Sequence, residues 1–400
     1  MQMNQITNEG AKQMLADRVR LKISIIGIGN AGNQLLNEAI KRDNVRVFAV
    51  NSSQKDLSNA VTNAEIASFI IGHDAKGAGK SRESAATFFQ QNGAELVTAV
   101  PAFTNMCDES DVIIVAGSTA GGTGSGVAPQ MIKLLQMMYN NKIIIYVGIL
   151  PRITDAPKAQ QNSIECLKEI QECKVPYLLA DLDYYKGIPN NVAYQQIQQY
   201  LMGCIDIMGG RYLNHSQYGM IDENDMRVIL SEPGYLSMYN LKDITQSQLE
   251  KESMQSQMVK LIKSSPAAER TRNGIINQMG VVLNTPEEMS DVTMSSDYTE
   301  LTDYIGTPIS IFENFANVPG ATGQMIIILS GQSSPIARIN EMNTRAQQAT
   351  GLAQTDYDFG EMIEGFNTKS HKTTIDLTGE TQEKNEDAKR AAALSFFKKN

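Results

Sequence analysis

The feature that most constrains this chain is a glycine-rich loop between an apolar segment and a helical one. Residues 111–115 (DVIIV) are apolar and β-branched, as in a buried parallel strand. Residues 127–139 repeat apolar side chains at helical spacing, and the loop between them is residues 116–126 (AGSTAGGTGSG). The order of strand, loop and helix predicts an α/β fold in which this loop opens a helix.

The composition of this loop indicates an anion-binding site. Its five glycines and four hydroxyl residues leave backbone N–H groups unshielded at a helix N-terminus, where the helix dipole favours a phosphate. A flexible turn is the alternative, although such turns rarely lie so tightly between a strand and a helix. No lysine stands between Gly117 and Gly126, so the loop is not a Walker A motif. A side chain at Gly122 is expected to block the phosphate without disturbing the fold.

A second glycine loop follows an earlier strand. Residues 21–26 are apolar, residues 27–32 (GIGNAG) fit G-x-G-x-x-G, and helical spacing follows. This pattern is typical of dinucleotide-binding units, so an NAD(P)-dependent oxidoreductase is the alternative function. That alternative requires an acidic residue at the end of the second strand. The second strand predicted, residues 45–50, is followed by Asn51 instead.

The loop at residues 120–126 (AGGTGSG) resembles the signature loop of the tubulin and FtsZ superfamily of GTP-binding, filament-forming proteins. The resemblance spans residues 21–330 and implies GTP or GDP as ligand, with Mg²⁺. It implies that the signature loop holds the phosphates through Ala120, Gly121, Gly122, Thr123, Gly124, Ser125 and Gly126. In the loop after the first strand it implies nucleotide contacts from Gly29, Asn30 and Gln34, and after the second strand from Asn51.

Three later loops match the superfamily in order. The resemblance implies that Gly77, Ala78 and Gly79 face the γ-phosphate, while the neighbouring Lys76, Lys80 and Arg82 are interpreted as a solvated face. It further implies that Asp155 lies near the ribose, with Lys158 in place of an expected arginine, and that Asp181 contacts the guanine edge.

Two carboxylates after the central helix resemble the acidic loop that serves catalysis in this superfamily. Asp222 and Asp225 are three residues apart, and the resemblance implies that they act on the nucleotide of the next subunit in a polymer. Helix N-capping by Asp222 is the alternative for such an acidic turn.

The fold class predicted is α/β: a Rossmann-like parallel sheet GTPase domain, a long central helix, a smaller α+β second domain, a C-terminal helix and a flexible tail. The limits predicted are an N-terminal helical extension at 1–20, the GTP-binding domain at 21–190, the central helix at 191–217, the second (activation) domain at 218–331, the C-terminal helix at 332–365 and the tail at 366–400. In the second domain we expect strands at 226–230, 234–238, 279–283 and 324–330, and helices at 246–264 and 297–305.

Composition excludes several function classes. A net charge of −9 argues against a body that coats nucleic acid or an anionic membrane. The four cysteines lack C-x-x-C spacing and there are only three histidines, so we expect no metal-ligand pattern among the side chains. We expect the cysteines to be free thiols in a reducing cytoplasm. The longest apolar run, residues 143–150, is too short to span a bilayer.

Within the superfamily the chain most resembles the partition tubulins of plasmids and phages (TubZ). A phage tubulin that positions DNA (PhuZ) is the close alternative, and a cell-division ring protein fits less well. The resemblance implies a cytoplasmic GTPase that forms a head-to-tail homopolymer. The tail, which is locally basic and carries Leu394, Phe396 and Phe397, is expected to be exposed and to recruit a DNA-bound adaptor, or to pack on a neighbouring subunit.

Overall fold

The computed structural model describes residues 20–72, 75–216, 219–286, 289, 298–318, 322–350 and 386–399. The N-terminal extension expected at 1–20 lies outside the described residues except for its last residue. Most of the tail expected at 366–400 also lies outside them.

Ten strands of the described chain form one sheet in the order β3-β2-β1-β4-β5-β6-β7-β10-β8-β9. Their bounds are β1 Ile23–Ile28, β2 Val45–Asn51, β3 Ala67–Ile70, β4 Val112–Ser118, β5 Ile143–Leu150, β6 Pro176–Asp181, β7 Gly234–Ile244, β8 Gln278–Thr285, β9 Ser310–Asn317 and β10 Gly323–Gln332. From β3 to β7 all neighbours are parallel, whereas β10 is antiparallel to both β7 and β8. The mixed α/β prediction is confirmed.

The helices connect these strands and cover the sheet. Their bounds are α2 Gly29–Ala39, α3 Gln54–Ala60, α4 Arg82–Ala99, α5 Pro101–Glu109, α6 Gly122–Met138, α7 Pro157–Glu172, the 3₁₀ turn η1 Leu182–Tyr185, α8 Asn190–Met208, α9 Glu223–Ser231, α10 Gln246–Lys251, α11 Met254–Lys263, α12 Thr299–Ile305, α13 Ile336–Thr350 and α15 Glu386–Lys399.

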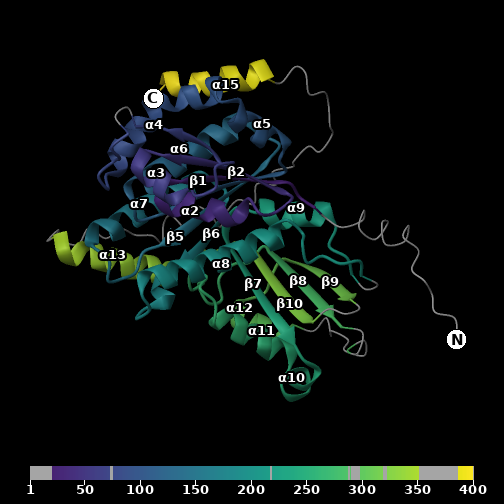
Figure 1. Ribbon diagram of the computed structural model, residues 1–400. Coiled ribbons are helices and arrows are strands. Elements are labelled where there is room, and N and C mark those ends of the chain that lie inside the picture. Colours follow the sequence, from purple (N-terminus) through teal and green to yellow (C-terminus); the bar gives the residue numbers. More distant parts are fainter. Residues whose placement is uncertain are drawn as a thin grey trace.

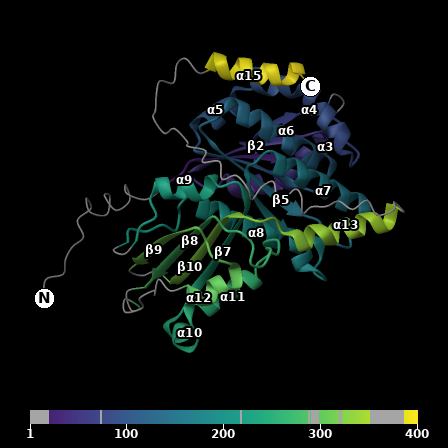
Figure 2. The same ribbon diagram turned by 180° about the vertical axis from the view of Figure 1, so that it is seen from behind.

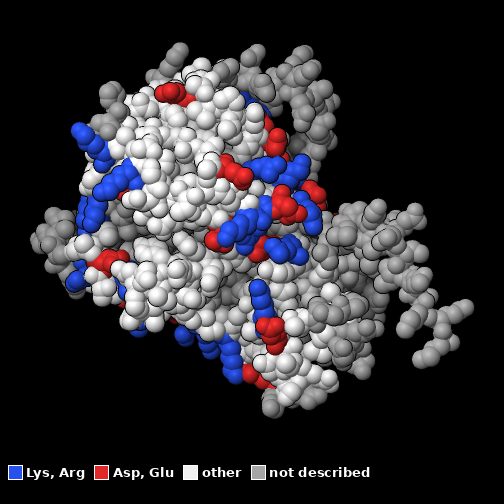
Figure 3. Space-filling view, in the orientation of Figure 1, with Lys and Arg blue, Asp and Glu red and all other residues white. Residues whose placement is uncertain are grey.

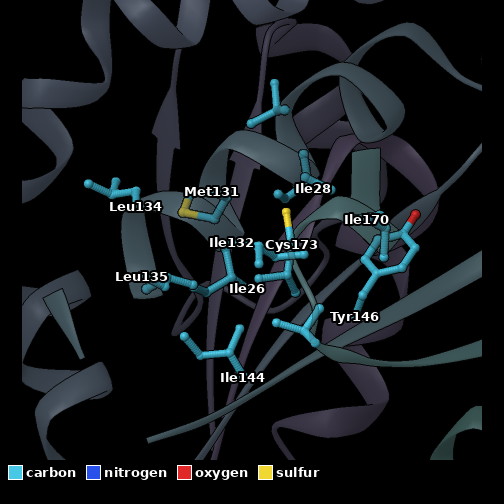
Figure 4. Packing of buried hydrophobic residues seen from close by; sticks show 14 of the residues in the cluster. Ile26, Ile28, Met131, Ile132, Leu134, Leu135, Ile144, Tyr146, Ile170 and Cys173 are labelled. Carbon is cyan, nitrogen blue, oxygen red and sulfur yellow. The ribbon is translucent and has the colours of Figure 1, made fainter. Parts of the chain in front are cut away.

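The parallel part of the sheet is buried on both faces because its side chains alternate between two cores. Ile113 and Val115 of β4 point into a core with α4, α6 and α7, part of which Figure 4 shows. Val112 and Ile114 point into the opposite core, with α2 and α8. Hydrophobic burial on both faces fixes the register of the strands, and so fixes where each connecting loop emerges.

The predicted long central helix is observed as α8, which runs from Asn190 to Met208 and ends before the expected residue 217. Its buried side chains include Ile197, Leu201 and Ile205, at the i, i+4 spacing of an amphipathic helix. Figure 1 shows α8 between the nucleotide-domain sheet and β7 to β10. The sheet is continuous there, so the predicted domain limits stay a prediction.

The second domain differs from prediction in three places. Residues 226–230, predicted as a strand, lie inside α9, whose buried Met226, Ile229 and Leu230 follow helical spacing. The helix expected at 246–264 is two helices, because the chain is extended at Glu252. The edge strand β9 was not predicted, because its inward side chains are mixed polar and apolar.

The C-terminal helix α13 returns to the nucleotide domain and lies beside α7 (Figure 2). The Arg338 guanidinium makes a bidentate ion pair with Asp181 at the end of β6, with Nε–Oδ2 2.7 Å and Nη2–Oδ1 3.2 Å. It also donates to the Pro151 carbonyl at 2.6 Å, beside the end of β5. The pair is buried, so α13 is fastened to two strand ends at once.

The prediction of a flexible tail is wrong for residues 386–399. They form helix α15, which packs on α4 and α6 at the outer face of the nucleotide domain (Figures 1 and 2). Ala393 is fully buried, and Phe396 and Phe397 pack against the nucleotide-domain core. The reason is amphipathic spacing, because these three residues recur at i, i+3 and i+4.

Charges of both signs alternate on the face shown in Figure 3. Arg20 pairs with Asp43, Lys41 with Glu38, and Arg42 with the half-buried Asp206 on α8. This face therefore has no single positive field of the kind that holds a nucleic acid backbone. Among the helices described, none is long and apolar enough to cross a membrane.

We predict that Arg338→Met lowers the free energy of unfolding by about 3 kcal/mol or more, because it leaves the Asp181 carboxylate buried without its cation. Arg272→Met is the matched control: Arg272 pairs with Glu269 at 4.0 Å on the exposed surface, where such pairs contribute less than about 1 kcal/mol. Urea unfolding of both variants measures the difference. Equal losses in the two variants would contradict the role given to Arg338.

Candidate functional site

The candidate site lies where the strand order reverses, between β1 and β4. Ligands of open α/β sheets bind outside the carboxyl ends of the strands at such a switch point. Helix α2 starts at Gly29 directly after β1, and α6 starts at Gly122 three residues after β4. The two loops touch, since a Cβ on Gly29 would lie 3.1 Å from the Gly124 nitrogen.

The N-terminus of α6 is open to a ligand. Gly121 is its N-cap, and no side chain caps the helix there. A Cβ on Gly121 would meet no protein atom within 4 Å. A 17-residue helix with uncapped N–H groups and free space at its first residue fits an anionic group.

The other glycines of this loop serve packing within the protein, which corrects the expectation for Gly122. A Cβ on Gly122 would lie 2.8 to 2.9 Å from the backbone of Lys80 and Ser81, and one on Gly126 would overlap the Arg82 carbonyl. A Cβ on Gly124 would lie 2.7 Å from the Ser118 carbonyl oxygen. Side chains at these positions therefore disturb the fold as well as any ligand.

The loop at 75–81 lies directly on the signature loop through these contacts. Gly77 and Gly79 have positive φ, +96° and +58°, and Ala78 is buried between them. The Gly77 N–H donates to the Ser52 carbonyl at 3.0 Å, and the Ser52 hydroxyl meets that of Thr123 at 2.7 Å. The predicted Gly77, Ala78 and Gly79 are thus held next to the predicted phosphate loop.

A buried amide pair joins β1, β2 and α2. The Asn51 amide donates to Asn33 Oδ1 at 2.8 Å, and the Asn33 amide donates to the Gly27 carbonyl at 2.7 Å. The Asn51 oxygen accepts from the backbone of Ser52 and Ser53. Asn51 is 2% exposed, so it holds the loops in place, and a direct nucleotide contact stays a prediction.

The side chains of Asn30 and Gln34 lie on the solvent side of α2, the first exposed and the second half-buried. Asn33, which was not predicted as a site residue, carries the structural hydrogen bonds instead. The helical spacing of residues 30 to 34 is the signal that separates them, because positions 30 and 34 share a face and position 33 faces the sheet.

Asp155 and Lys158 follow β5 at the same edge of the sheet. Asp155 Oδ2 accepts from the Arg152 N–H at 3.0 Å, while Lys158 is exposed on the first turn of α7. Burial raises the pKa of Tyr194 on α8, and the Asp155 charge acts in the same direction. The start of α8 therefore lies beside this loop.

Asp181 is engaged inside the protein, and its predicted contact with the guanine edge stays a prediction. Both of its carboxylate oxygens accept from Arg338, and one also accepts from the Asp183 N–H at 3.0 Å. Its side chain is 11% exposed. This carboxylate fastens α13 to β6.

Asp222 and Asp225 form a capping box at the start of α9. The Asp225 N–H donates to Asp222 Oδ1 at 2.8 Å, and the Asp222 N–H donates to Asp225 Oδ2 at 3.1 Å. Helix capping, the alternative reading of this turn, is therefore observed. One oxygen of each carboxylate makes the cap, and Asp222 is exposed.

This acidic turn lies at the opposite edge of the sheet from the glycine loops. Arg227 of α9 pairs with Asp111 at 2.5 Å, and Asp111 precedes β4. From Asp111 to Thr119, where the glycine loop begins, the chain spans roughly 26 Å at 3.3 Å per residue. The Asp222 and Asp225 carboxylates cannot reach a nucleotide held by their own chain.

Comparison with known proteins identifies the nucleotide domain. Residues 22–181 match the tubulin/FtsZ family, GTPase domain. This chain contains a tubulin/FtsZ GTPase domain. The match includes residues 27–32, so the alternative of an NAD(P)-dependent oxidoreductase is set aside.

One relative matches well beyond the GTPase domain, and another matches a shorter part of the chain. The tubulin-like protein TubZ of Clostridium botulinum C phage is 25% identical over 332 residues, 80% of this chain and 82% of TubZ. CetZ2 of Haloferax volcanii is 27% identical over 177 residues, 42% of this chain and 47% of CetZ2.

Solved structures share the fold. The Clostridium botulinum phage c-st TubZ structure has a TM-score of 0.64 at 20% identity and covers 83% of this chain and 99% of that one. A GTPγS-bound protofilament of Haloferax volcanii CetZ2 has a TM-score of 0.67 at 19% identity and covers 83% and 100%.

Arg82 is the residue of the GTPase domain that the sequence analysis misjudged. It was interpreted as solvated, yet it is 6% exposed. Its guanidinium pairs with Glu165 and Glu169 of α7, both at 3.0 Å, and donates to the Ser125 carbonyl at 3.1 Å. Glu165 and Glu169, four residues apart on α7, would repel each other without a cation between them. Arg82 thus ties α4, α6 and α7 together just behind the two phosphate-facing loops.

We predict that Gly122→Ala destabilises the GTPase domain by about 1 to 3 kcal/mol, because its Cβ overlaps the Lys80 and Ser81 backbone. Gly121→Ala is the matched control in the same loop, since its φ of −79° suits any residue and its Cβ meets open space. It should change stability by no more than about 1 kcal/mol. Thermal unfolding without nucleotide measures both, and equal stabilities would contradict the packing role of Gly122.

Proposed function

We propose that this chain binds GTP with Mg²⁺ at the β1–β4 switch point and hydrolyses it on assembling head to tail into filaments. The observation that carries the proposal is that the acidic turn belongs to α9, which contacts the start of β4, whereas the glycine loop follows the other end of that strand, roughly 26 Å along it. A site whose two parts lie at opposite edges of one sheet is completed only when a second copy brings its acidic turn to the loops. Repetition of that heterologous contact builds a filament.

The residues present fit the nucleotide. The N–H groups in the first turn of α6, which no side chain caps, suit phosphate oxygens, and the open space at Gly121 leaves room for them. Residues 77–79 lie against that loop and close it from the γ-phosphate side. The same edge of the sheet carries four polar residues that would contact the rest of the ligand. Asn30 would approach the phosphates and magnesium, Gln34 the base, and Asp155 with Lys158 the ribose.

Phosphoryl transfer to water requires little covalent chemistry from the protein. GTP supplies the transferable phosphoryl group, and Mg²⁺ neutralises charge on its oxygens. The loops supply amides, hydroxyls and backbone donors, which position the phosphates and stabilise their negative charge. Asp222 and Asp225 of the next copy supply carboxylates that orient the attacking water. Hydrolysis is therefore coupled to assembly.

The cellular role we propose is movement or positioning of plasmid or phage DNA in the cytoplasm. The similarity to phage TubZ over 80% of the chain supports it. The net charge of −9 leaves DNA contact to an adaptor, which the C-terminal segment would recruit, and the face in Figure 3 carries charges of both signs. The GTPγS-bound protofilament formed by CetZ2 supports the proposal that this chain forms a polymer.

We predict that the chain binds GTP in preference to NADH, and that Gly121→Val weakens GTP binding by about tenfold or more while the fold is kept. The added side chain enters the space assigned to phosphate, where its Cβ meets no protein atom within 4 Å. Gly203→Val on α8 is the matched control, because its Cβ also meets nothing within 4 Å. Equilibrium binding measures all three proteins. Unchanged GTP affinity in Gly121→Val would refute the loop assignment.

We predict that Asp225→Asn binds GTP and polymerises, yet hydrolyses it roughly 10²-fold more slowly or worse, giving long-lived filaments. Asparagine keeps the oxygen that accepts from the Asp222 N–H, so the cap survives and only the charge is lost. Asp222→Asn should act similarly. Glu223→Gln removes the same charge from the same helix turn and serves as the control.

Phosphate release as a function of protein concentration is the measurement. The rate per subunit of the wild type should rise at the assembly threshold, which light scattering detects independently. A rate that stays flat across that threshold, or that is unchanged in Asp225→Asn, would show that the active site is not shared between copies.

A further inference from the structure

Helix α15 lies on a surface that is shaped for it. Its buried face consists of Lys389, Ala393, Phe396 and Phe397, which recur at the spacing of one helix face. It crosses α4 and α6 on the outer side of the nucleotide domain, away from β7 to β10 (Figures 1 and 2). Leu394, 37% exposed, faces away from this contact.

The centre of the contact is a notch at Gly93 in the middle of α4. A Cβ on Gly93 would lie 2.7 Å from Cε1 and Cζ of Phe397. The same ring meets Phe89 edge to face, with ring centroids 5.7 Å apart. Glycine lowers helix propensity in a helix interior, and at this position it makes room for the Phe397 ring.

A charge contact orients the other end of α15. Lys389 Nζ lies 2.6 Å from Asp108 Oδ1 on α5 and 4.8 Å from the centroid of the Tyr139 ring at the end of α6. An ion pair and a cation–π contact on one ammonium group fix the direction of the helix as well as its place.

Helix α15 depends on this surface for its structure. A 14-residue helix is marginal in water by itself. Residues 351–385, 35 in number, join it to α13, and such a connection reaches at most about 120 Å. Among the described residues, release of α15 breaks chiefly its contacts with α4, α5 and α6, which lie outside the sheet.

We propose that the face formed by α4, α5 and α6 is a docking site for the chain's own C-terminal helix, and that α15 is detachable. Docked, it buries Phe397 in the Gly93 notch and withholds both phenylalanines from any other ligand. Released, it presents them together as an amphipathic helix for a partner with an apolar groove. Partner binding by the C-terminal segment and docking of α15 are then mutually exclusive.

Hydrogen exchange of the full chain, read by mass spectrometry without nucleotide, tests this proposal independently of GTP hydrolysis. The amides of 386–399 should be protected, yet exchange faster than those of β4, because α15 opens without global unfolding. Phe397→Ala and Gly93→Leu, on opposite sides of the contact, should each speed that exchange roughly tenfold or more. Leu394→Ala is the matched control and should leave it unchanged.

Three outcomes would overturn the proposal. Exchange of 386–399 at the rate of an unstructured peptide in the wild type would show that α15 does not dock. Exchange of 386–399 only together with β4 would show that it does not detach. Protection that rises with protein concentration would show that the face holds α15 of a second copy. Unaltered β4 protection in both variants confirms that they fold.

Discussion

The close approach of backbone to backbone at the glycines of residues 122–126 is the constraint on which the site depends. The signature loop lies so near residues 80–82 that any Cβ at Gly122 would come within 2.9 Å of main-chain atoms. Two loops from distant parts of the chain thereby form one surface. Arg82 secures it from behind, and its burial between α6 and α7 is compensated by two glutamates.

The direction of the parallel strands decides what this surface can do. All strands from β1 to β6 deliver their following loops to one edge, so the glycine loops gather there. Helix α9, where Asp222 and Asp225 stand, lies at the opposite edge, beside Asp111, which precedes β4. Because a strand is rigid and has a fixed rise, one copy cannot bring its carboxylates to its own loops. The proposed coupling of hydrolysis to assembly follows from this geometry.

Two C-terminal elements return to the nucleotide domain by different kinds of contact. Arg338 on α13 is a buried guanidinium with a bidentate carboxylate partner, so removing it leaves a buried charge. Helix α15 is held by aromatic packing and by the ion pair of Lys389 with Asp108, whose side chains are 19% and 32% exposed. The first contact suits a permanent joint between distant parts of the chain. The second suits an element that leaves its site.

The sequence by itself determined the parallel nucleotide domain, its glycine loops and the central helix, because β-branched apolar runs, helical spacing and glycine-rich turns are local signals. Residue patterns also pointed to Asp222 and Asp225. Only the tertiary structure decided that Gly122 packs against protein, that Asp181 pairs with Arg338, that Arg82 is buried and that residues 386–399 dock as a helix. Each of these depends on a partner far along the chain: 157 residues separate Asp181 from Arg338, and 281 separate Asp108 from Lys389. Local patterns carry no information about such pairs, which exist only once the sheet has set its edges and faces.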